Sequence, residues 1–378
     1  MKIGIDALAI SVPRRYVDME DLARARGVDP AKYTIGLGAR EMAVAEPGED
    51  TVALAAQAAD RVLEGRDRAE LGMLVVGTET GVDHSKAVAS FVHGLLELPR
   101  TMRVYDTQHA CYGGTAGLMA AVEWIASGAG AGRSALVICS DVARYGVGTA
   151  GEPTQGAGAV AMIVREDPSV LAIDVGMSGT ASAHVHDFWR PLGRREAQVD
   201  GHYSVECYLD ALAIAYRGWC ERAGDAELAR VCYHVPFCKM AKKAHAHVRD
   251  EASFDTEVAP SLTVCSRVGN IYTGSLYLAV AGLLDAQAAE LAGSRIGLFS
   301  YGSGCTSEFF SGTVSSRAAD AIARAQISRV LAARERISVP EYEQIMRMTA
   351  PIGDVREFSF VGVEDHQRRY ERGAPDCH

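Results

Sequence analysis

Short, continuously apolar runs alternate along the chain with longer Ala-rich runs in which apolar residues recur at helical spacing. The apolar runs are rich in Val, Ile and Leu, which is typical of strands covered on both faces. This alternation predicts an α/β protein, a largely parallel sheet with helices packed on its faces. The expected strands are Leu71–Gly77, Ser134–Ser140, Ala159–Val164 and Arg295–Ser300; the expected helices are Val52–Glu64, Thr115–Ala126, Val205–Arg222 and Ser275–Leu291.

Two stretches of the chain follow the same plan of a strand, a Gly-rich turn and a second strand. They read SALVICSDVARYG…GAGAVAMIV from Ser134 and RIGLFSYGSGCTSEFFSGTV from Arg295. This similarity indicates an internal duplication of one α/β unit. Because no Pro- or Ser-rich linker interrupts the chain, we expect one body over residues 1–378, with an N-terminal half (1–168) and a C-terminal half (169–378).

Composition and charge narrow the class of protein. Of 378 residues, 48% are hydrophobic, which is enough for a large core, and 38 Lys and Arg face 48 Asp and Glu, a net charge of −10. This acidic balance argues against a nucleic-acid binder but leaves room for a local basic pocket. The longest uncharged run, Val268 to Leu284, is too short and polar to span a membrane comfortably. Nine scattered cysteines favour free thiols and a cytoplasmic location.

Cys111 is the first candidate for chemistry. It follows an expected strand (Met102–Tyr105) and precedes Gly113, Gly114 and a helix pattern. A sulfur near a helix N-terminus gains stabilisation of its thiolate, and the glycines leave space for a substrate. The competing interpretation is a small buried cysteine.

His234 ends a strand-like run beside Pro236, before a helix that carries Lys239, Lys242 and Lys243. A catalytic histidine at a strand end competes here with a hydrogen-bonded core histidine. A zinc site is a third alternative, but paired Cys-x-x-Cys spacing is missing. The zinc candidates are Cys232, His234, Cys238, His245 and His247. The lysines form either a solvated helix face or a pocket for a phosphate-bearing ligand.

Three further residues lie at strand ends or turns. Glu79 follows the strand Leu71–Gly77, where a carboxylate is well placed to act as a general base. Asn270 precedes a helix and could simply cap it. Ser303 lies in the turn Tyr301-Gly302-Ser303-Gly304, whose amides could form part of an oxyanion hole. Together with Cys111 and His234, these residues indicate acyl-thioester chemistry.

At these positions the sequence resembles the 3-hydroxy-3-methylglutaryl-CoA synthase family of thiolase-like condensing enzymes, over nearly the whole chain. The matching motifs are IGLGAREMAV, GTETGVDHSKA around Glu79, HACYGGTAG around Cys111, GEPTQGAGAVAM with Thr154, DFWRP from Asp187, HVPFCKMAKKA from His234, VGNIYTGSLYL with Asn270, and FSYGSG with Ser303. The resemblance implies a thiolase-like, five-layered αβαβα fold from two pseudo-duplicated halves. It also implies a homodimer that needs neither a metal nor a redox cofactor.

The resemblance further implies a role for each matching residue. Cys111 would take an acetyl group from acetyl-CoA, and Glu79 would remove a proton from its methyl group. His234 and Asn270 would polarise the ketone of acetoacetyl-CoA, and His234 would protonate the alkoxide. Backbone amides at Cys111 and Ser303 would hold the thioester oxyanion. The resemblance also places Thr154, Asp187, Lys239, Lys242 and Lys243 in substrate binding, the lysines at the CoA phosphates.

Alternatives remain open within and beyond this family. GEPTQGAGAVAM, DFWRP and the lysines resemble the mevalonate-pathway branch, which uses acetyl-CoA, whereas ACYGGTAG, CSRVGN and SYGSGCTSEF resemble the polyketide β-branching branch, which uses an acyl carrier protein. We favour the first. A ketoacyl synthase III-type decarboxylative enzyme would share the Cys, His and Asn but would not need Glu79. A non-catalytic scaffold stabilised by zinc is the remaining alternative.

Overall fold

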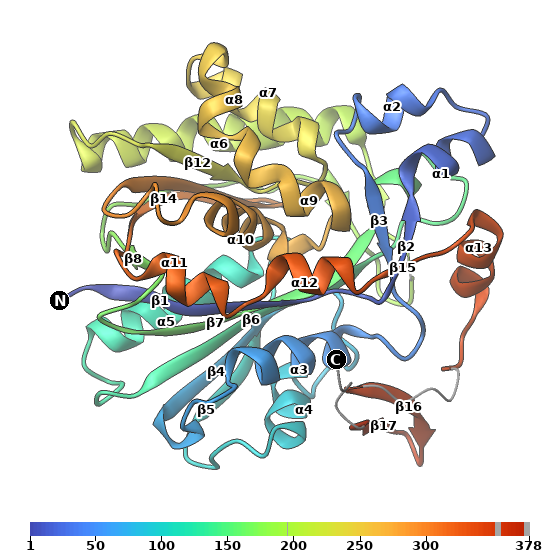
Figure 1. Ribbon diagram of the computed structural model, residues 1–378, viewed down its shortest axis with the longest axis horizontal. Helices are drawn as coiled ribbons and strands as arrows, with labels where there is room; N and C mark the ends of the chain where they lie inside the picture. Colours follow the sequence, from blue (N-terminus) through green and yellow to red (C-terminus); the bar gives the residue numbers. More distant parts are fainter. Residues whose placement is uncertain (195, 352–356, 374–378) are drawn as a thin grey trace.

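A ten-stranded sheet forms the centre of the computed structural model, which describes residues 1–194, 196–351 and 357–373 (Figure 1). Its strands follow the order β12-β13-β14-β8-β1-β7-β6-β4-β5, and β9 pairs with β14 off this path. They are β1 (Ile3–Ser11), β4 (Leu71–Gly77), β5 (Arg103–Thr107), β6 (Ser134–Ala143), β7 (Gly156–Glu166), β8 (Leu171–Ile173), β9 (Gly179–Ser182), β12 (Arg230–Tyr233), β13 (Arg295–Gly302) and β14 (Thr306–Val314).

The pairings of the sheet repeat about the contact between β1 and β8. On one side β1 pairs antiparallel with β7, β7 antiparallel with β6, and β6 parallel with β4. On the other side β8 pairs antiparallel with β14, β14 antiparallel with β13, and β13 parallel with β12. The predicted internal repeat therefore corresponds to two antiparallel pairs, β6–β7 and β13–β14, in equivalent places. The predicted boundary between residues 168 and 169 stays a prediction.

Alternate residues along the strands of the first half pack into two separate cores. Met73 and Val75 of β4 join the core that contains α5, whereas Leu74 and Val76 join the core that contains α3. Both faces of this part of the sheet are therefore covered by helices, which explains why its strands are apolar throughout.

The helices form outer layers and a buried inner layer. Helix α3 packs on β1, β6 and β7, and α5 packs on β4, β6 and β7. The inner helices α5 and α10 share one core with α6, which packs on β9 and β14. The principal helices are α3 (Thr51–Val62), α4 (Val88–Leu95), α5 (Gly113–Ala126), α6 (Gly201–Ala223), α7 (Cys238–Val248), α9 (Leu262–Val268) and α10 (Ser275–Gln287). Outer helices, the two halves of the sheet and the buried inner helices between them make up the predicted five-layered arrangement.

Shorter helices and strands lie around the large sheet and its helices (Figure 1). Three small sheets lie outside the large one: β15-β2-β3, β10-β11 and β16-β17. Their strands are β2 (Arg15–Asp18), β3 (Glu41–Val44), β10 (Phe188–Trp189), β11 (Gln198–Val199), β15 (Glu335–Arg336), β16 (Ser359–Glu364) and β17 (Gln367–Glu371). The remaining helices are α1 (Met19–Ala25), α2 (Pro30–Thr34), α8 (Phe254–Glu257), α11 (Ala318–Ala323), α12 (Ile327–Ala332) and α13 (Val339–Arg347).

The predicted elements occur close to their expected bounds, but the prediction of a largely parallel sheet is wrong. Within the large sheet, β4–β5, β4–β6 and β12–β13 are the parallel pairs, and the other pairs are antiparallel. The apolar pattern could not distinguish these cases, because a strand buried on both faces is continuously apolar in either arrangement. Among the described residues, no helix is long and apolar enough to cross a membrane, and eight cysteines are free thiols.

Candidate active site

Cys111 lies in a tight turn directly before α5. The preceding residue, Ala110, has a left-handed backbone (φ 40°), and Tyr112 donates its N–H to the carbonyl of His109 at 2.9 Å. Helix α5 can approach β6 closely because residue 114 is glycine. A Cβ on Gly114 would lie 2.8 Å from the carbonyl oxygen of Thr273 and would collide with Sγ of Cys139. The glycines therefore place Cys111 deep in the protein, where it is 9% exposed.

The thiol of Cys111 is paired with the carboxylate of Glu79. Sγ lies 3.6 Å from Oε1 of Glu79. Burial and the nearby charge of Glu79 raise the pKa of the Cys111 thiol well above its usual value. The predicted stabilisation of a thiolate by the helix N-terminus is thus outweighed in the free protein, because burial and a neighbouring carboxylate both disfavour the anion.

Glu79 is a carboxylate with an unusually high pKa. Burial, and then the charge of Asp141, raise the pKa of Glu79 to about 8, while Arg190 and the hydrogen bond from Cys111 act in the opposite direction. A carboxylate that titrates near neutral pH is suited to general-base catalysis, because it is both available in its ionised form and basic.

Asp141, at the end of β6, holds the segment that carries Glu79. Its Oδ1 accepts hydrogen bonds from the N–H of Glu79 (2.9 Å) and from the N–H and hydroxyl of Thr80 (3.0 and 2.7 Å). Thr78 donates its hydroxyl to the same oxygen at 2.9 Å, and Thr273 donates its N–H and hydroxyl to Oδ2 at 3.1 and 2.6 Å. Asp141 therefore joins Glu79 to the loop that contains Asn270.

Asn270 has a fixed amide orientation. Its Oδ1 accepts hydrogen bonds from the N–H of Tyr272 (2.9 Å) and from the hydroxyl of Ser275 (2.8 Å), and its Nδ2 donates to the hydroxyl of Tyr145 at 3.4 Å. The capping interpretation is wrong, because the residue that caps α10 is Gly274; Oδ1 of Asn270 instead holds the loop before α10, and Nδ2 is directed to Tyr145. The rings of Tyr145, Phe188 and Tyr272 contact one another and pack with Cys111.

His234 directly follows β12 and is 2% exposed. Its N–H donates to the carbonyl of Phe299 at 2.7 Å, and its own carbonyl accepts the hydroxyl of Tyr208 at 2.7 Å. These bonds fix the backbone of His234 to the second half of the sheet. Burial lowers the pKa of His234 to about 3, so its imidazole is neutral near pH 7.

The turn that contains Ser303 packs against the turn that contains Cys111. A Cβ on Gly302 would lie 2.6 Å from the backbone nitrogen of Tyr112, so residue 302 must be glycine for the two turns to meet. Asp187 holds the same turn: its Oδ1 accepts the N–H of Gly304 (2.9 Å) and its Oδ2 the hydroxyl of Tyr301 (2.8 Å). Asp187 is fully buried and supports this turn, and its predicted role in substrate binding stays a prediction.

The other predicted binding residues lie apart from this cluster. Thr154 uses its hydroxyl within its own turn, on the carbonyl of Gly151 at 2.8 Å. Lys239, Lys242 and Lys243 lie on α7, with Lys242 paired to Glu251 at 3.2 Å. None of these hydrogen bonds or ion pairs joins the four residues to the cluster around Cys111. The role of Thr154 in substrate binding and that of the three lysines at the CoA phosphates stay predictions.

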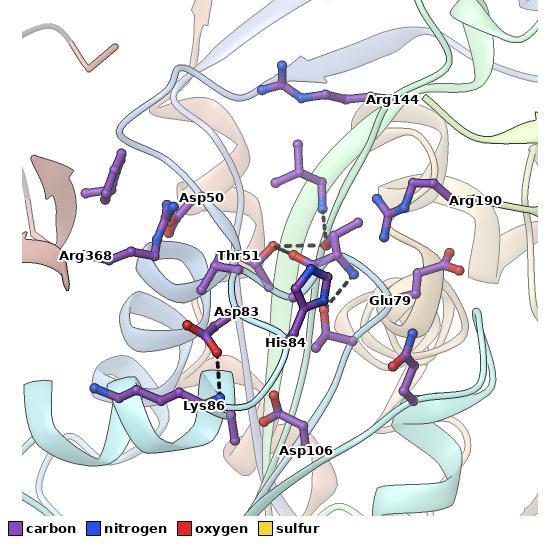
Figure 2. A pocket seen from close by; sticks show the side chains of 18 of the residues that line it. Asp50, Thr51, Glu79, Asp83, His84, Lys86, Asp106, Arg144, Arg190 and Arg368 are labelled. Atoms are coloured by element: carbon purple, nitrogen blue, oxygen red, sulfur yellow. Dashed lines mark hydrogen bonds and ion pairs between the residues drawn. The ribbon is translucent and has the colours of Figure 1, made fainter. Parts of the chain in front are cut away.

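A cavity of about 1070 Å³ reaches Glu79 from the side of β16 and β17. Cys111, His234, Asn270 and Ser303 are not among the residues that line it. Figure 2 shows Glu79 and Arg190 close together in this cavity, with Arg144, Lys86 and Arg368 also on its wall. The cavity meets the cluster only at the carboxylate of Glu79, and the lysines of α7 do not line it.

Sequence reasoning missed three residues of this site: Asp141, Tyr145 and Tyr272. The signal for Asp141 was present, since it is an acidic residue at the mouth of a buried strand, the same pattern that selected Glu79. The two tyrosines had no such signal, because only the fold brings them to Cys111. In the described part of the chain, no three His, Cys, Asp or Glu side chains are grouped to hold a metal ion, so the zinc alternative gains no support.

The layered, internally repeated fold and its paired cysteine and carboxylate define a thiolase-like condensing enzyme. Comparison with known proteins specifies the family. The model of the hydroxymethylglutaryl-coenzyme A synthase N-terminal domain matches residues 1–169, and that of the C-terminal domain matches residues 171–251 and 250–368. The chain belongs to the hydroxymethylglutaryl-CoA synthase family of acyl-transferring condensing enzymes.

Individual relatives cover almost the whole chain. A hydroxymethylglutaryl-CoA synthase of Enterococcus faecalis is 39% identical over 98% of this chain and 100% of its own. The solved structure of MvaS in complex with 3-hydroxy-3-methylglutaryl coenzyme A is 60% identical, with a TM-score of 0.97 and coverage of 99% of both chains. The polyketide biosynthesis 3-hydroxy-3-methylglutaryl-ACP synthase PksG of Bacillus subtilis is 36% identical over 91% of this chain and 88% of its own.

Proposed function

We propose that this protein condenses an acetyl group, carried by Cys111, with acetoacetyl-CoA and hydrolyses the adduct to 3-hydroxy-3-methylglutaryl-CoA and free CoA. The observation that carries the proposal is the contact of 3.6 Å between Sγ of Cys111 and Oε1 of Glu79, at a helix N-terminus and beside the turn of Ser303. A nucleophile and a base in contact are what a ping-pong acyl transfer followed by carbanion formation requires.

The first half-reaction is transfer of the acetyl group to Cys111. Because the thiol is protonated in the free protein, Glu79 accepts its proton as sulfur attacks the thioester, and the proton leaves with CoA as its thiol. Backbone amides at Cys111 and Ser303 stabilise the oxyanion. This step leaves acetyl-cysteine and an ionised Glu79.

The second half-reaction forms the carbon–carbon bond. Glu79 removes a proton from the acetyl methyl group, and the enolate attacks the ketone carbon of acetoacetyl-CoA. The neutral imidazole of His234 and the amide of Asn270 polarise the ketone oxygen, and His234 passes a proton to the alkoxide, to be replaced from solvent. Water then cleaves the enzyme thioester. The route uses CoA thioesters and residues of this chain, with neither a metal nor a redox cofactor.

The carrier of the acetyl group separates this proposal from polyketide β-branching. The 60% identity to MvaS in its complex with 3-hydroxy-3-methylglutaryl coenzyme A, against 36% for PksG, favours CoA. Intact mass after mixing with acetyl-CoA, or with acetyl on an acyl carrier protein, tests the choice. A gain of one acetyl group from acetyl-CoA that is lost in Cys111→Ala supports the proposal, and a gain from the carrier protein alone contradicts it.

We also propose that the protein is a cytoplasmic homodimer. Free thiols at all eight described cysteines favour a reducing compartment. Strand β5 ends the large sheet with residues that are only partly buried, and an open sheet edge of this kind is commonly covered by a partner. Light scattering that gives the mass of a single chain at micromolar concentration would contradict the dimer.

A further inference from the structure

The segment Asp187–Pro191 contacts two separate parts of the candidate site and carries a third residue, Arg190, on the wall of the cavity. Asp187 holds the turn of Ser303 through Tyr301 and Gly304. Phe188 packs on Tyr145 and Tyr272, over Cys111, with ring centroids 6.1 and 5.8 Å apart. These two contacts belong to the site described above, whereas Arg190 has no function yet.

Arg190 and Glu79 lie together where the cavity meets the catalytic cluster. Both side chains line the cavity, and Figure 2 shows Arg190 and Glu79 on the same side of it. Arg190 is half-buried and directly follows β10, whose two-residue pairing with β11 and whose anchor at Asp187 restrict its position. A restrained cation is thus available where the base needs a counter-charge.

The other groups that act on Glu79 do not provide this counter-charge. Asp141 is acidic, and Cys111, Tyr145 and Tyr272 are neutral when protonated and can only add negative charge. Burial and Asp141 raise the pKa of Glu79, whereas Arg190 lowers it. Without a cation, the ionised fraction of a buried carboxylate beside a second carboxylate would be smaller still at neutral pH, and less of the protein could use it as a base.

We propose that Arg190 is a positioning residue for the general base, whose cation favours the ionised carboxylate of Glu79 over the protonated one. The inference rests on the proposed role of Glu79 and extends it by naming the group that makes this base usable near neutral pH. Arg190 acts through Glu79 and need not touch either substrate.

The pH profile of kcat, measured with saturating acetyl-CoA and acetoacetyl-CoA, tests the proposal. Arg190→Gln removes the cation, so the acid limb of the profile should move up by about one pH unit, with kcat at pH 7 falling about tenfold and kcat at pH 9.5 changing less than about twofold. Arg190→Lys keeps the positive charge, so its acid limb should lie at the same pH as that of the unmodified enzyme. Acetylation of Cys111 by acetyl-CoA, read by intact mass, shows that each variant is folded.

Arg194→Gln is the matched control, because Arg194 lines the same cavity four residues further along the chain and is not among the groups that shift the pKa of Glu79. The acid limb of the pH profile of Arg194→Gln should stay in place. An unmoved limb in Arg190→Gln, or an equal shift in Arg194→Gln, overturns the role of Arg190 while leaving Glu79 as the base. A Glu79→Gln variant that keeps the limb of the unmodified enzyme overturns both the role of Arg190 and the proposed base.

Discussion

Asp141 accepts the backbone N–H of Glu79 at 2.9 Å, so the residue that fixes the candidate base in place also brings a second buried carboxylate next to it. Positioning and electrostatics act against each other in this pair. The hydrogen bond holds the segment of Glu79 rigid, while the charge of Asp141 contributes to a pKa of about 8 for Glu79. The high pKa makes Glu79 a stronger base at the cost of a smaller ionised fraction at pH 7.

The first prediction concerns the pH dependence of the unmodified enzyme. Proton abstraction needs ionised Glu79, whose pKa is about 8, so kcat should rise with pH and level off above about pH 9. Steady-state rates between pH 6 and 10 check this. If kcat is flat from pH 6.5 to 9, either Glu79 is not the base or proton abstraction does not limit the rate; a solvent-exchange assay on the acetyl methyl group separates these outcomes.

Glu79→Gln should separate the two half-reactions. Glutamine preserves the shape of the side chain but cannot take a proton from carbon, so formation of 3-hydroxy-3-methylglutaryl-CoA should fall by about 100-fold or more. Slower acetylation of Cys111 should still reach one acetyl group per chain, because the thiol can lose its proton to water. Product analysis by chromatography and intact mass measure the two effects. Condensation that survives in this variant would instead favour the decarboxylative ketoacyl synthase alternative.

Asp187→Ala should loosen the turn that contains Ser303. It removes the acceptor for the N–H of Gly304 and the hydroxyl of Tyr301, so we expect a loss of about 2 to 3 kcal/mol in the free energy of unfolding. Urea unfolding measures this loss. Asp200→Ala is the control, because Asp200 only caps α6 at an exposed position, where the loss should be about 1 kcal/mol. Equal losses would mean that Asp187 does not hold the turn.

Site residues that one segment of the sequence identifies were predicted, whereas residues that only the fold brings together were not. Glu79 and Cys111 each follow a recognisable strand, and their contact agrees with that placement. Tyr145 and Tyr272 lie 127 residues apart and meet only because β6 and the loop before α10 converge over Cys111. Burial also changed the electrostatic prediction for Cys111, since sequence position shows the helix N-terminus but not the surrounding carboxylates.

The same limit applies to the sheet. The Gly-rich turns before β7 and β14 identified the internal repeat, because their glycines leave a signal in the sequence. Strand direction left none, since apolar residues cover both faces of parallel and antiparallel strands alike. The mixed pairing of β6 with β4 and β7 could therefore be seen only in the structure.

The stability of the protein should depend on the ion pair between Arg26 and Glu152. Glu152 is 1% exposed and accepts two hydrogen bonds of 2.7 Å from Arg26, so Arg26→Met leaves a buried carboxylate without its cation. We expect a loss of about 3 kcal/mol in the free energy of unfolding. Arg24→Met is the matched control, two residues earlier in the last turn of α1, because Arg24 pairs with Glu20 and Asp21 in solvent and its loss should cost less than about 1 kcal/mol. Both variants should still acquire one acetyl group on Cys111. If urea unfolding gives similar losses for the two variants, the buried pair does not stabilise the packing of α1 against the segment before β7.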